Sequence, residues 1–272
     1  MNEFIELIKY LILGIVQGFT EILPISSSGH LVLFQHILNL KQPGLVFEMF
    51  TNTASFLALF IFFSKDIIHL IKQTWSFVIK GDKEAKNDFF YVLKLIVAII
   101  PIGIVGLLIK DHLDGFKTPL FVGLALLLTG SFLFYIYKNR NENNLNEEIT
   151  FKNALVIGLI QVAAVFPGIS RSGSTIIGGL FQKVSLKSLL KFSFLCYIII
   201  SVPTSLLSAI ELSNATFEIN ILGYGLAFLS TFVATYFAAY LLMKKIEVRH
   251  LKYFAIYCFT IGLVAISSHL FF

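Results

Sequence analysis

A related sequence occurs twice in this chain, as LGIVQGFTEILPISSSGH at residues 13–30 and as IGLIQVAAVFPGISRSGS at residues 157–174. The two copies align at a constant offset without a gap. Six positions are identical, and the matching pairs are Gly14 with Gly158, Gln17 with Gln161, Ile25 with Ile169, Ser26 with Ser170, Ser28 with Ser172 and Gly29 with Gly173. We interpret this repeat as the duplication of one half of the protein.

The two copies differ where they carry their most reactive groups. The first copy has Glu21, Ser27 and His30 at the positions where the second has Val165, Arg171 and Ser174. The carboxylate, one serine and the imidazole therefore belong to one copy, and the guanidinium belongs to the other. This division predicts a single site that is assembled from both copies.

The composition is that of an integral membrane protein. Of the 272 residues, 57% are hydrophobic and 14% are charged, whereas charged residues make up about 25% of a typical soluble domain. Six apolar runs approach the ~20 residues that a spanning helix needs, and they lie at about 45–63, 89–109, 118–137, 187–210, 219–243 and 251–271. The net charge of +5 resides largely in the loops between these runs, so we expect no binding of nucleic acid.

Lysine and arginine are unevenly distributed among the loops. Residues 65–88 hold five, 138–152 three, 183–191 three and 244–252 four, whereas 110–117 holds two and 211–218 none. Basic residues are enriched in cytoplasmic loops, so the first four loops are predicted to be cytoplasmic. The segment 153–182 then begins and ends on the cytoplasmic side, which predicts a re-entrant hairpin.

We therefore expect an all-α polytopic membrane protein built as an inverted-topology repeat, with six spanning helices and two re-entrant helical hairpins. The first repeat would occupy residues 1–137 with its hairpin at about 4–40, a cytoplasmic connector would follow at 138–152, and the second repeat would occupy 153–272. Inverted repeats place broken helices and their exposed N-termini near the bilayer midplane. The two turns, Pro24–Gly29 and Pro167–Gly173, fit this position.

The turns predict an anion site. A helix N-terminus presents free backbone N–H groups to anions, and two such turns facing each other suit a doubly phosphorylated ligand. Arg171 adds a positive charge whose planar fork matches phosphate oxygens. An arginine at this depth costs roughly 2.5–3.5 kcal/mol and needs a partner or a purpose, so the alternative is a structural ion pair with Glu21.

The first copy supplies candidates for catalysis. Gln17 and Glu21 are four residues apart and share a helix face, while Ser27 and His30 are three apart on the next helix. Ser27 could attack a phosphorus atom, with His30 or Glu21 accepting its proton. Glu21 could instead hold a divalent cation, which needs only one or two protein carboxylates besides phosphate oxygens and waters, and a metal-activated water then stays open as the nucleophile. The alternative for His30 is a packing role.

Further residues are candidates for binding. We expect the serines to cap the outgoing helices and to donate to phosphate. Glu48 could be a metal ligand or could lie at the outer membrane interface, and Thr175 could donate to phosphate or pack between helices. The full set of candidate substrate-binding residues is Ser26, Ser28, Gly29, Ser170, Ser172, Gly173 and Thr175.

The sequences QGFTE and PISSSGHL at residues 17–31, together with PGISRSGST at 167–175, resemble the bacterial undecaprenyl-diphosphate phosphatase family. These are integral membrane enzymes linked to bacitracin resistance, and the resemblance extends over the whole length. It implies hydrolysis of an isoprenoid diphosphate to its monophosphate, which recycles the carrier lipid for peptidoglycan. It also implies dependence on Mg²⁺ or Ca²⁺ and a multi-pass location in the cytoplasmic membrane, with a site open to the outer, periplasmic face.

The resemblance also implies roles for individual residues. Glu21 matches the essential acid, Ser27 the proposed nucleophile, His30 the proposed base and Arg171 the phosphate clamp. Ser26, Ser170 and Thr175 would line the site, and Glu48 falls where the family has a second acid. The resemblance implies a metal ligand at the position of Gln17, where many members carry glutamate. The loss of that charge leads us to expect a weaker dependence on Mg²⁺.

A second class of function stays open at this stage. Inverted repeats with half-helices at the midplane also occur in secondary transporters, so a lipid-phosphate flippase or transporter is the leading alternative. The asymmetry between the two copies favours an enzyme, because reacting groups would lie in one copy and the electrostatic clamp in the other. The sequence leaves open whether two copies associate as a homodimer.

Overall fold

The computed structural model describes residues 2–38, 44–139, 145–213 and 220–271. Within these ranges the chain is mainly helical, and the pairing of extended segments is limited to an isolated bridge between Asn146 and Val184. Three predicted segments extend beyond the described residues. The connector at 138–152 does so in part, and the end of the first hairpin at 39–40 and residue 219 do so completely. The all-α class predicted from the sequence is confirmed.

Eleven α-helices are found in the described residues, and they are α1 Asn2–Ile22, α2 Ser27–Ile37, α3 Gly44–Phe62, α4 Ser64–Lys80, α5 Lys86–Ile109, α6 Pro119–Lys138, α7 Phe151–Gln161, α8 Arg171–Leu180, α9 Leu186–Ser213, α10 Ile221–Lys245 and α11 Leu251–Phe271. Short 3₁₀ turns lie at η1 Lys83–Ala85, η2 Lys110–Phe116, η3 Val162–Val165 and η4 Val248–His250.

Five helical segments are long and apolar enough to cross a membrane, and they are Lys83–Ile109, Pro119–Lys138, Leu186–Ile210, Ile221–Lys245 and Val248–His269. A sixth span is obtained when Val46–Phe62 and Ser64–Lys80, which are bent by 72° relative to each other, are taken as one broken segment. The chain is therefore a polytopic membrane protein, with the predicted run at 45–63 forming the first part of the bent pair.

The sequence-based prediction of a loop at 65–88 is wrong over most of its length, because α4 occupies Ser64–Lys80. This helix is amphipathic. Ile68, Ile71 and Trp75 form part of an exposed apolar face, and Lys65 and Lys72 lie elsewhere on the same helix. The basic residues alone suggested a loop, although the apolar residues recur at helical spacing.

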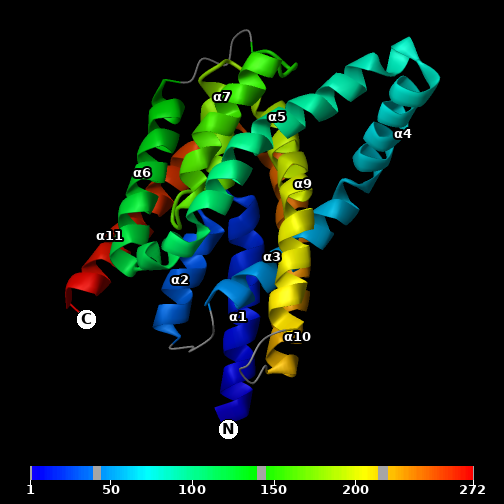
Figure 1. Cartoon of the computed structure of the whole chain (residues 1–272). Coiled ribbons are helices and arrows are strands. Elements are labelled where there is room, and N and C mark those ends of the chain that lie inside the picture. The colour runs from blue at the N-terminus through cyan, green and yellow to red at the C-terminus, as the bar shows by residue number, and fades with distance from the viewer. Residues whose placement is uncertain (1, 39–43, 140–144, 214–219, 272) are drawn as a thin grey trace.

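The two predicted hairpins differ in length. In the second, α7 and α8 have 11 and 10 residues, and at 1.5 Å per residue neither reaches across a bilayer. In the first, α2 is equally short, but α1 has 21 residues. Figure 1 shows α1 rising from the N-terminus at the lower end of the bundle, whereas α7 lies at the upper end. The re-entrant and inverted arrangement relative to a membrane stays a prediction.

The duplicated glycines allow equivalent close helix contacts in the two halves. A Cβ atom added to Gly14 of α1 would lie 2.4 Å from the carbonyl oxygen of Ala227 in α10. One added to Gly158 of α7 would lie 2.6 Å from the carbonyl oxygen of Ala98 in α5. Small residues let helices approach closely in a membrane, where packing drives their association. These contacts fix α1 and α7, and therefore the turns that follow them.

Candidate active site

The two duplicated turns cap their outgoing helices in the same way. The Ser26 hydroxyl oxygen accepts a hydrogen bond from the backbone N–H of Gly29 at 3.3 Å, and that of Ser170 accepts from Gly173 at 3.0 Å. The predicted capping by serine is confirmed at both sites. Ser28 and Ser172 lie beside the caps, with oxygen–oxygen distances of 3.4 and 3.3 Å to Ser26 and Ser170.

The turns also touch each other. The Ser172 hydroxyl donates to the backbone carbonyl of Leu23 at 3.1 Å, and a Cβ atom added to Gly29 would lie 2.9 Å from the Cα atom of Gly168. Ser26 has a φ of 70°, a value that non-glycine residues rarely adopt. Such strain often accompanies functional sites. The N-termini of α2 and α8 therefore meet in the interior of the bundle.

An ion pair joins the two halves at this junction. Nη2 of Arg171, the first residue of α8, lies 2.6 Å from Oε1 of Glu21, the next-to-last residue of α1. The side chains are only 18% and 7% exposed, respectively. A buried charge requires a partner, and each of these residues supplies one for the other. The second guanidinium nitrogen, Nη1, is buried and has no hydrogen-bond partner among the described residues.

Glu21 also binds the two other polar groups that the sequence placed near it. The Ser27 hydroxyl donates to Oε2 at 2.5 Å, and Nε2 of Gln17 donates to the same oxygen at 3.1 Å. The carboxylate therefore contacts an arginine, a serine and an amide at once. Its position is suited to accept a proton from Ser27.

His30 lies close in sequence but makes other contacts. Its Nδ1 is 2.7 Å from the carbonyl oxygen of Ser26, and its Nε2 is 2.9 Å from the hydroxyl of Tyr257. A carbonyl only accepts, so Nδ1 carries the proton and the neutral ring accepts at Nε2. The ring is 1% exposed and stacks on Tyr257 with centroids 5.5 Å apart. Of the two predicted base candidates, Glu21 is the one hydrogen-bonded to Ser27.

Gln17 is the residue with the most unusual surroundings. Its Nε2 also donates to Oδ1 of Asn52 in α3 at 2.6 Å, while its Oε1 is buried and without a hydrogen-bond partner among the described residues. The carboxylate of Glu21 accepts, so the end of the Gln17 amide that faces it is the nitrogen. Glu48 lies one turn before Asn52 on α3 and so on the same helix face. No cluster of three or more His, Cys, Asp or Glu side chains suited to a metal occurs among the described residues.

The remaining candidates are accounted for by their helices. Thr175 is fully buried, and its hydroxyl donates to the carbonyl of Arg171 at 3.2 Å, as hydroxyls commonly do within a helix. Two residues at the site were missed from the sequence. Tyr197 of α9 packs against the Arg171 guanidinium, and Tyr257 of α11 holds His30. Each tyrosine lies in an apolar helix rich in aromatic residues, so nothing in the sequence distinguishes it from its neighbours.

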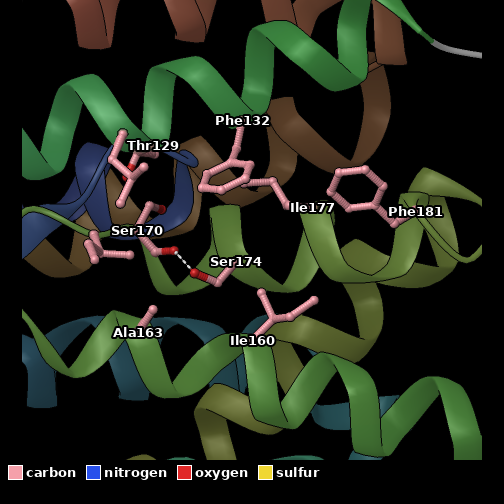
Figure 2. Close-up of a pocket in the computed structure, with 10 residues that line it drawn as sticks. Thr129, Phe132, Ile160, Ala163, Ser170, Ser174, Ile177 and Phe181 are labelled. Carbon is pink, nitrogen blue, oxygen red and sulfur yellow. Dashed lines mark hydrogen bonds between the residues drawn. The ribbon is translucent and has the colours of Figure 1, made fainter.

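A cavity of about 160 Å³ lies on another side of the second turn, between α6, α7 and α8 (Figure 2). Phe132, Ile160 and Ile177 contribute to its apolar walls, and Ser170 and Ser174 line it as well. The dashed line in Figure 2 is the 2.8 Å bond from the Ser174 hydroxyl to the Ser170 carbonyl. The cavity is lined by apolar side chains and hydroxyls, whereas the charged groups meet at the Glu21–Arg171 pair.

Comparison with known proteins gives a consistent result over the whole chain. A family model described as bacitracin resistance protein BacA matches residues 10–264. The undecaprenyl-diphosphatase of Acholeplasma laidlawii is 45% identical over 279 residues, which cover 99% of this chain and 100% of that protein. Undecaprenyl-diphosphatase 1 of Bacillus cereus is 40% identical over 268 residues, covering 98% and 99%. The undecaprenyl-diphosphatase of Oceanobacillus iheyensis is 38% identical over 272 residues, covering 97% and 98%.

Proposed function

The chain belongs to the bacitracin resistance protein BacA family, and from that premise we propose that it hydrolyses undecaprenyl diphosphate to undecaprenyl phosphate and inorganic phosphate. The observation that carries the proposal is the junction of the two turns, where Ser27 and Arg171 both bind Glu21. The activity recycles the carrier lipid for peptidoglycan synthesis and confers bacitracin resistance.

Arg171 binds the diphosphate in this proposal. Its Nη2 is held by Glu21, and its Nη1 has no partner among the described residues. A guanidinium donates to phosphate oxygens in a planar, often bidentate arrangement. The N-termini of α2 and α8 add backbone N–H groups and the hydroxyls of their serine caps. Together these groups stabilise the charge that develops on the terminal phosphoryl group.

Ser27 is the proposed nucleophile. Its Oγ attacks the terminal phosphorus, and the bond between that phosphorus and the bridging oxygen breaks, which releases undecaprenyl phosphate. Glu21 accepts the hydroxyl proton over the 2.5 Å hydrogen bond. Water then attacks the phosphoserine, and Ser27 recovers its proton as inorganic phosphate leaves. His30, held by Ser26 and Tyr257, keeps the start of α2 in place for this step.

We further propose that a divalent cation takes part in the reaction. Oε1 of Gln17 is buried and has no hydrogen-bond partner among the described residues, while the amide nitrogen of the same side chain binds Glu21. Mg²⁺ needs only one or two protein carboxylates when phosphate oxygens and waters complete its shell. Glu21 and Gln17 would hold Mg²⁺ or Ca²⁺, with Glu48 as a further candidate. The bound ion would neutralise part of the diphosphate charge.

The proposal also covers the membrane in which the protein resides and the number of chains that its site needs. The family resemblance implies that the protein resides in the bacterial cytoplasmic membrane with its site open to the outer face. The distribution of lysine and arginine predicts only which loops are cytoplasmic. The residues of the site all come from one chain. A homodimer, which the sequence leaves open, is therefore not required to complete it.

The direct test is release of inorganic phosphate from undecaprenyl diphosphate by detergent-purified protein, with Mg²⁺ or with EDTA. We expect release that depends on the cation and undecaprenyl phosphate as the lipid product. A well-folded protein that releases no phosphate under either condition would contradict the proposal. It would favour the flippase or transporter that the repeat architecture also allows.

The Gln17→Glu substitution is expected to strengthen the dependence on Mg²⁺. A second carboxylate adds a full negative charge beside Glu21, and like charges this close repel each other unless a cation lies between them. The Mg²⁺ concentration for half-maximal phosphate release should fall, and Mg²⁺ should raise the melting temperature of the variant more than that of the wild type.

Gln73→Glu, a glutamine replacement in α4, serves as the control for the added charge. It should leave both titrations unchanged. If Gln17→Glu gives the wild-type Mg²⁺ curve in phosphate release and in thermal stability, Gln17 is not a ligand of the ion.

A further inference from the structure

Tyr197 is a buried residue of α9 that contacts two parts of the site at once. Its side chain is 5% exposed, and the guanidinium carbon of Arg171 lies 4.0 Å from the centroid of its ring. Its hydroxyl donates to the backbone carbonyl of Asn52 in α3 at 2.9 Å. One face of the tyrosine therefore supports the arginine, while its tip holds the neighbouring helix.

The side chain of Asn52 continues this connection toward the carboxylate. Its Oδ1 accepts from Gln17 at 2.6 Å, and Gln17 donates to Glu21 at 3.1 Å. Glu21 in turn binds Arg171 at 2.6 Å. The contacts thus close a ring that runs through Arg171, Glu21, Gln17, Asn52 and Tyr197 and back to Arg171. Its members come from α8, α1, α3 and α9.

We propose that Tyr197 and Asn52 are positioning residues that hold Arg171 and the Gln17–Glu21 pair in the orientation needed for the diphosphate, without touching it themselves. This inference rests on the proposed phosphatase function. Arginine has a long and flexible side chain, and fixing it costs rotamer entropy. A cation held against an aromatic face and paired at one edge has little freedom left, so its other nitrogen is directed in advance toward a ligand.

Phe194, an aromatic residue one turn before Tyr197 on α9, shows what a role in packing alone looks like. Phe194 is 2% exposed, and its ring packs against Phe63 with centroids 5.9 Å apart. Phe194 and Tyr197 both belong to the main apolar core. Tyr197 is equally buried, but its ring faces a cation and its hydroxyl binds a backbone carbonyl. Phe194 is therefore a matched control for the loss of a buried aromatic side chain on the same helix.

The first experiment compares Tyr197→Leu, Tyr197→Phe and Phe194→Leu in phosphate release from undecaprenyl diphosphate. A cation on an aromatic face contributes an amount that corresponds to about 2- to 30-fold in a rate or equilibrium constant. We expect Tyr197→Leu to lower kcat/KM by about this factor, with a higher KM and a lower kcat. Tyr197→Phe, which keeps the ring, should recover most of the loss.

The control decides between positioning and packing. Phe194→Leu should lower the melting temperature about as much as Tyr197→Leu does, yet leave kcat and KM close to wild type. Equal kinetic losses in the two leucine variants would overturn the inference. A loss of kcat/KM in Tyr197→Phe as large as in Tyr197→Leu would overturn the role of the aromatic ring of Tyr197.

The second experiment tests the contact between Asn52 and Gln17 by removing only the side-chain amide of Asn52. A hydrogen bond of this kind corresponds to about 2- to 12-fold, so Asn52→Ala should lower kcat/KM by that factor. The loss should largely vanish in a Gln17→Ala background, because the two side chains act through one bond. Thr53→Ala is the control, since that hydroxyl binds Met49 and Ser205 instead.

Additive losses in the double variant would overturn the role of Asn52. This comparison decides the inference even if Tyr197→Leu fails to fold. The experiments test the proposed function and the positioning roles separately. A wild type that releases no phosphate rejects the proposed function, whereas an active wild type with unaffected Tyr197 and Asn52 variants rejects only the positioning roles.

Discussion

Arg171→Ala is expected to abolish measurable phosphate release. The substitution removes the group that we propose to bind the diphosphate, and loss of one such electrostatic donor costs about 10²- to 10³-fold in kcat. It also leaves the carboxylate of Glu21, whose side chain is only 7% exposed, without the guanidinium that pairs with it. Breaking a buried pair in this way destabilises a protein by about 3–5 kcal/mol. Activity and melting temperature should therefore both fall.

Two further variants separate these effects. Arg171→Lys keeps the charge beside Glu21 but cannot offer the planar fork, so it should restore much of the stability and little of the activity. Arg249→Ala is the control, because that arginine is exposed and pairs with Glu247 at the surface. It should behave as wild type. Wild-type kcat/KM in a folded Arg171→Ala protein would show that the pair is only structural, which is the alternative that the sequence left open.

The meeting of Glu21, Ser27 and Arg171 was predictable because the chain is duplicated. Inverted repeats place their broken helices at the interface between the repeats, and Glu21 and Arg171 carry opposite charges. The spacing of Gln17 and Glu21 predicted that they share a helix face, and the structure adds a 3.1 Å hydrogen bond between them. Patterns within one helix, and the repeat between two, were therefore sufficient for the centre of the site.

Contacts between helices without such a pattern were not predictable. Tyr197 is one of ten tyrosines beside 29 phenylalanines, so nothing in the sequence distinguishes the ring that supports Arg171. The same holds for Tyr257 and His30. Ser27 and His30 share a helix face, yet the imidazole binds the carbonyl of Ser26, the N-cap residue, and the hydroxyl of Tyr257 in α11. Spacing gives the face on which a side chain lies, but the competing partners on other elements decide what it binds.

Ser27→Ala is the second substitution with a large expected effect. If Ser27 attacks the phosphorus, its removal eliminates the group that forms the covalent intermediate, and loss of a serine nucleophile costs up to about 10⁶-fold in a serine protease. We expect a loss of roughly 10³-fold or more in kcat. Binding should persist, because Arg171 and both helix N-termini stay in place. A thermal shift with undecaprenyl diphosphate would measure this.

The result also distinguishes the two chemical routes that the sequence leaves open. A serine nucleophile predicts a phosphoserine at residue 27, detectable by mass spectrometry after rapid quenching, and no turnover in the alanine variant. A metal-activated water predicts no phosphoserine and a modest loss, since Ser27 would then only donate a hydrogen bond to Glu21. Ser131→Ala removes an exposed hydroxyl of α6 and should match wild type. Near-normal turnover by Ser27→Ala would therefore assign the attack to water and leave Glu21 as the group that orients it.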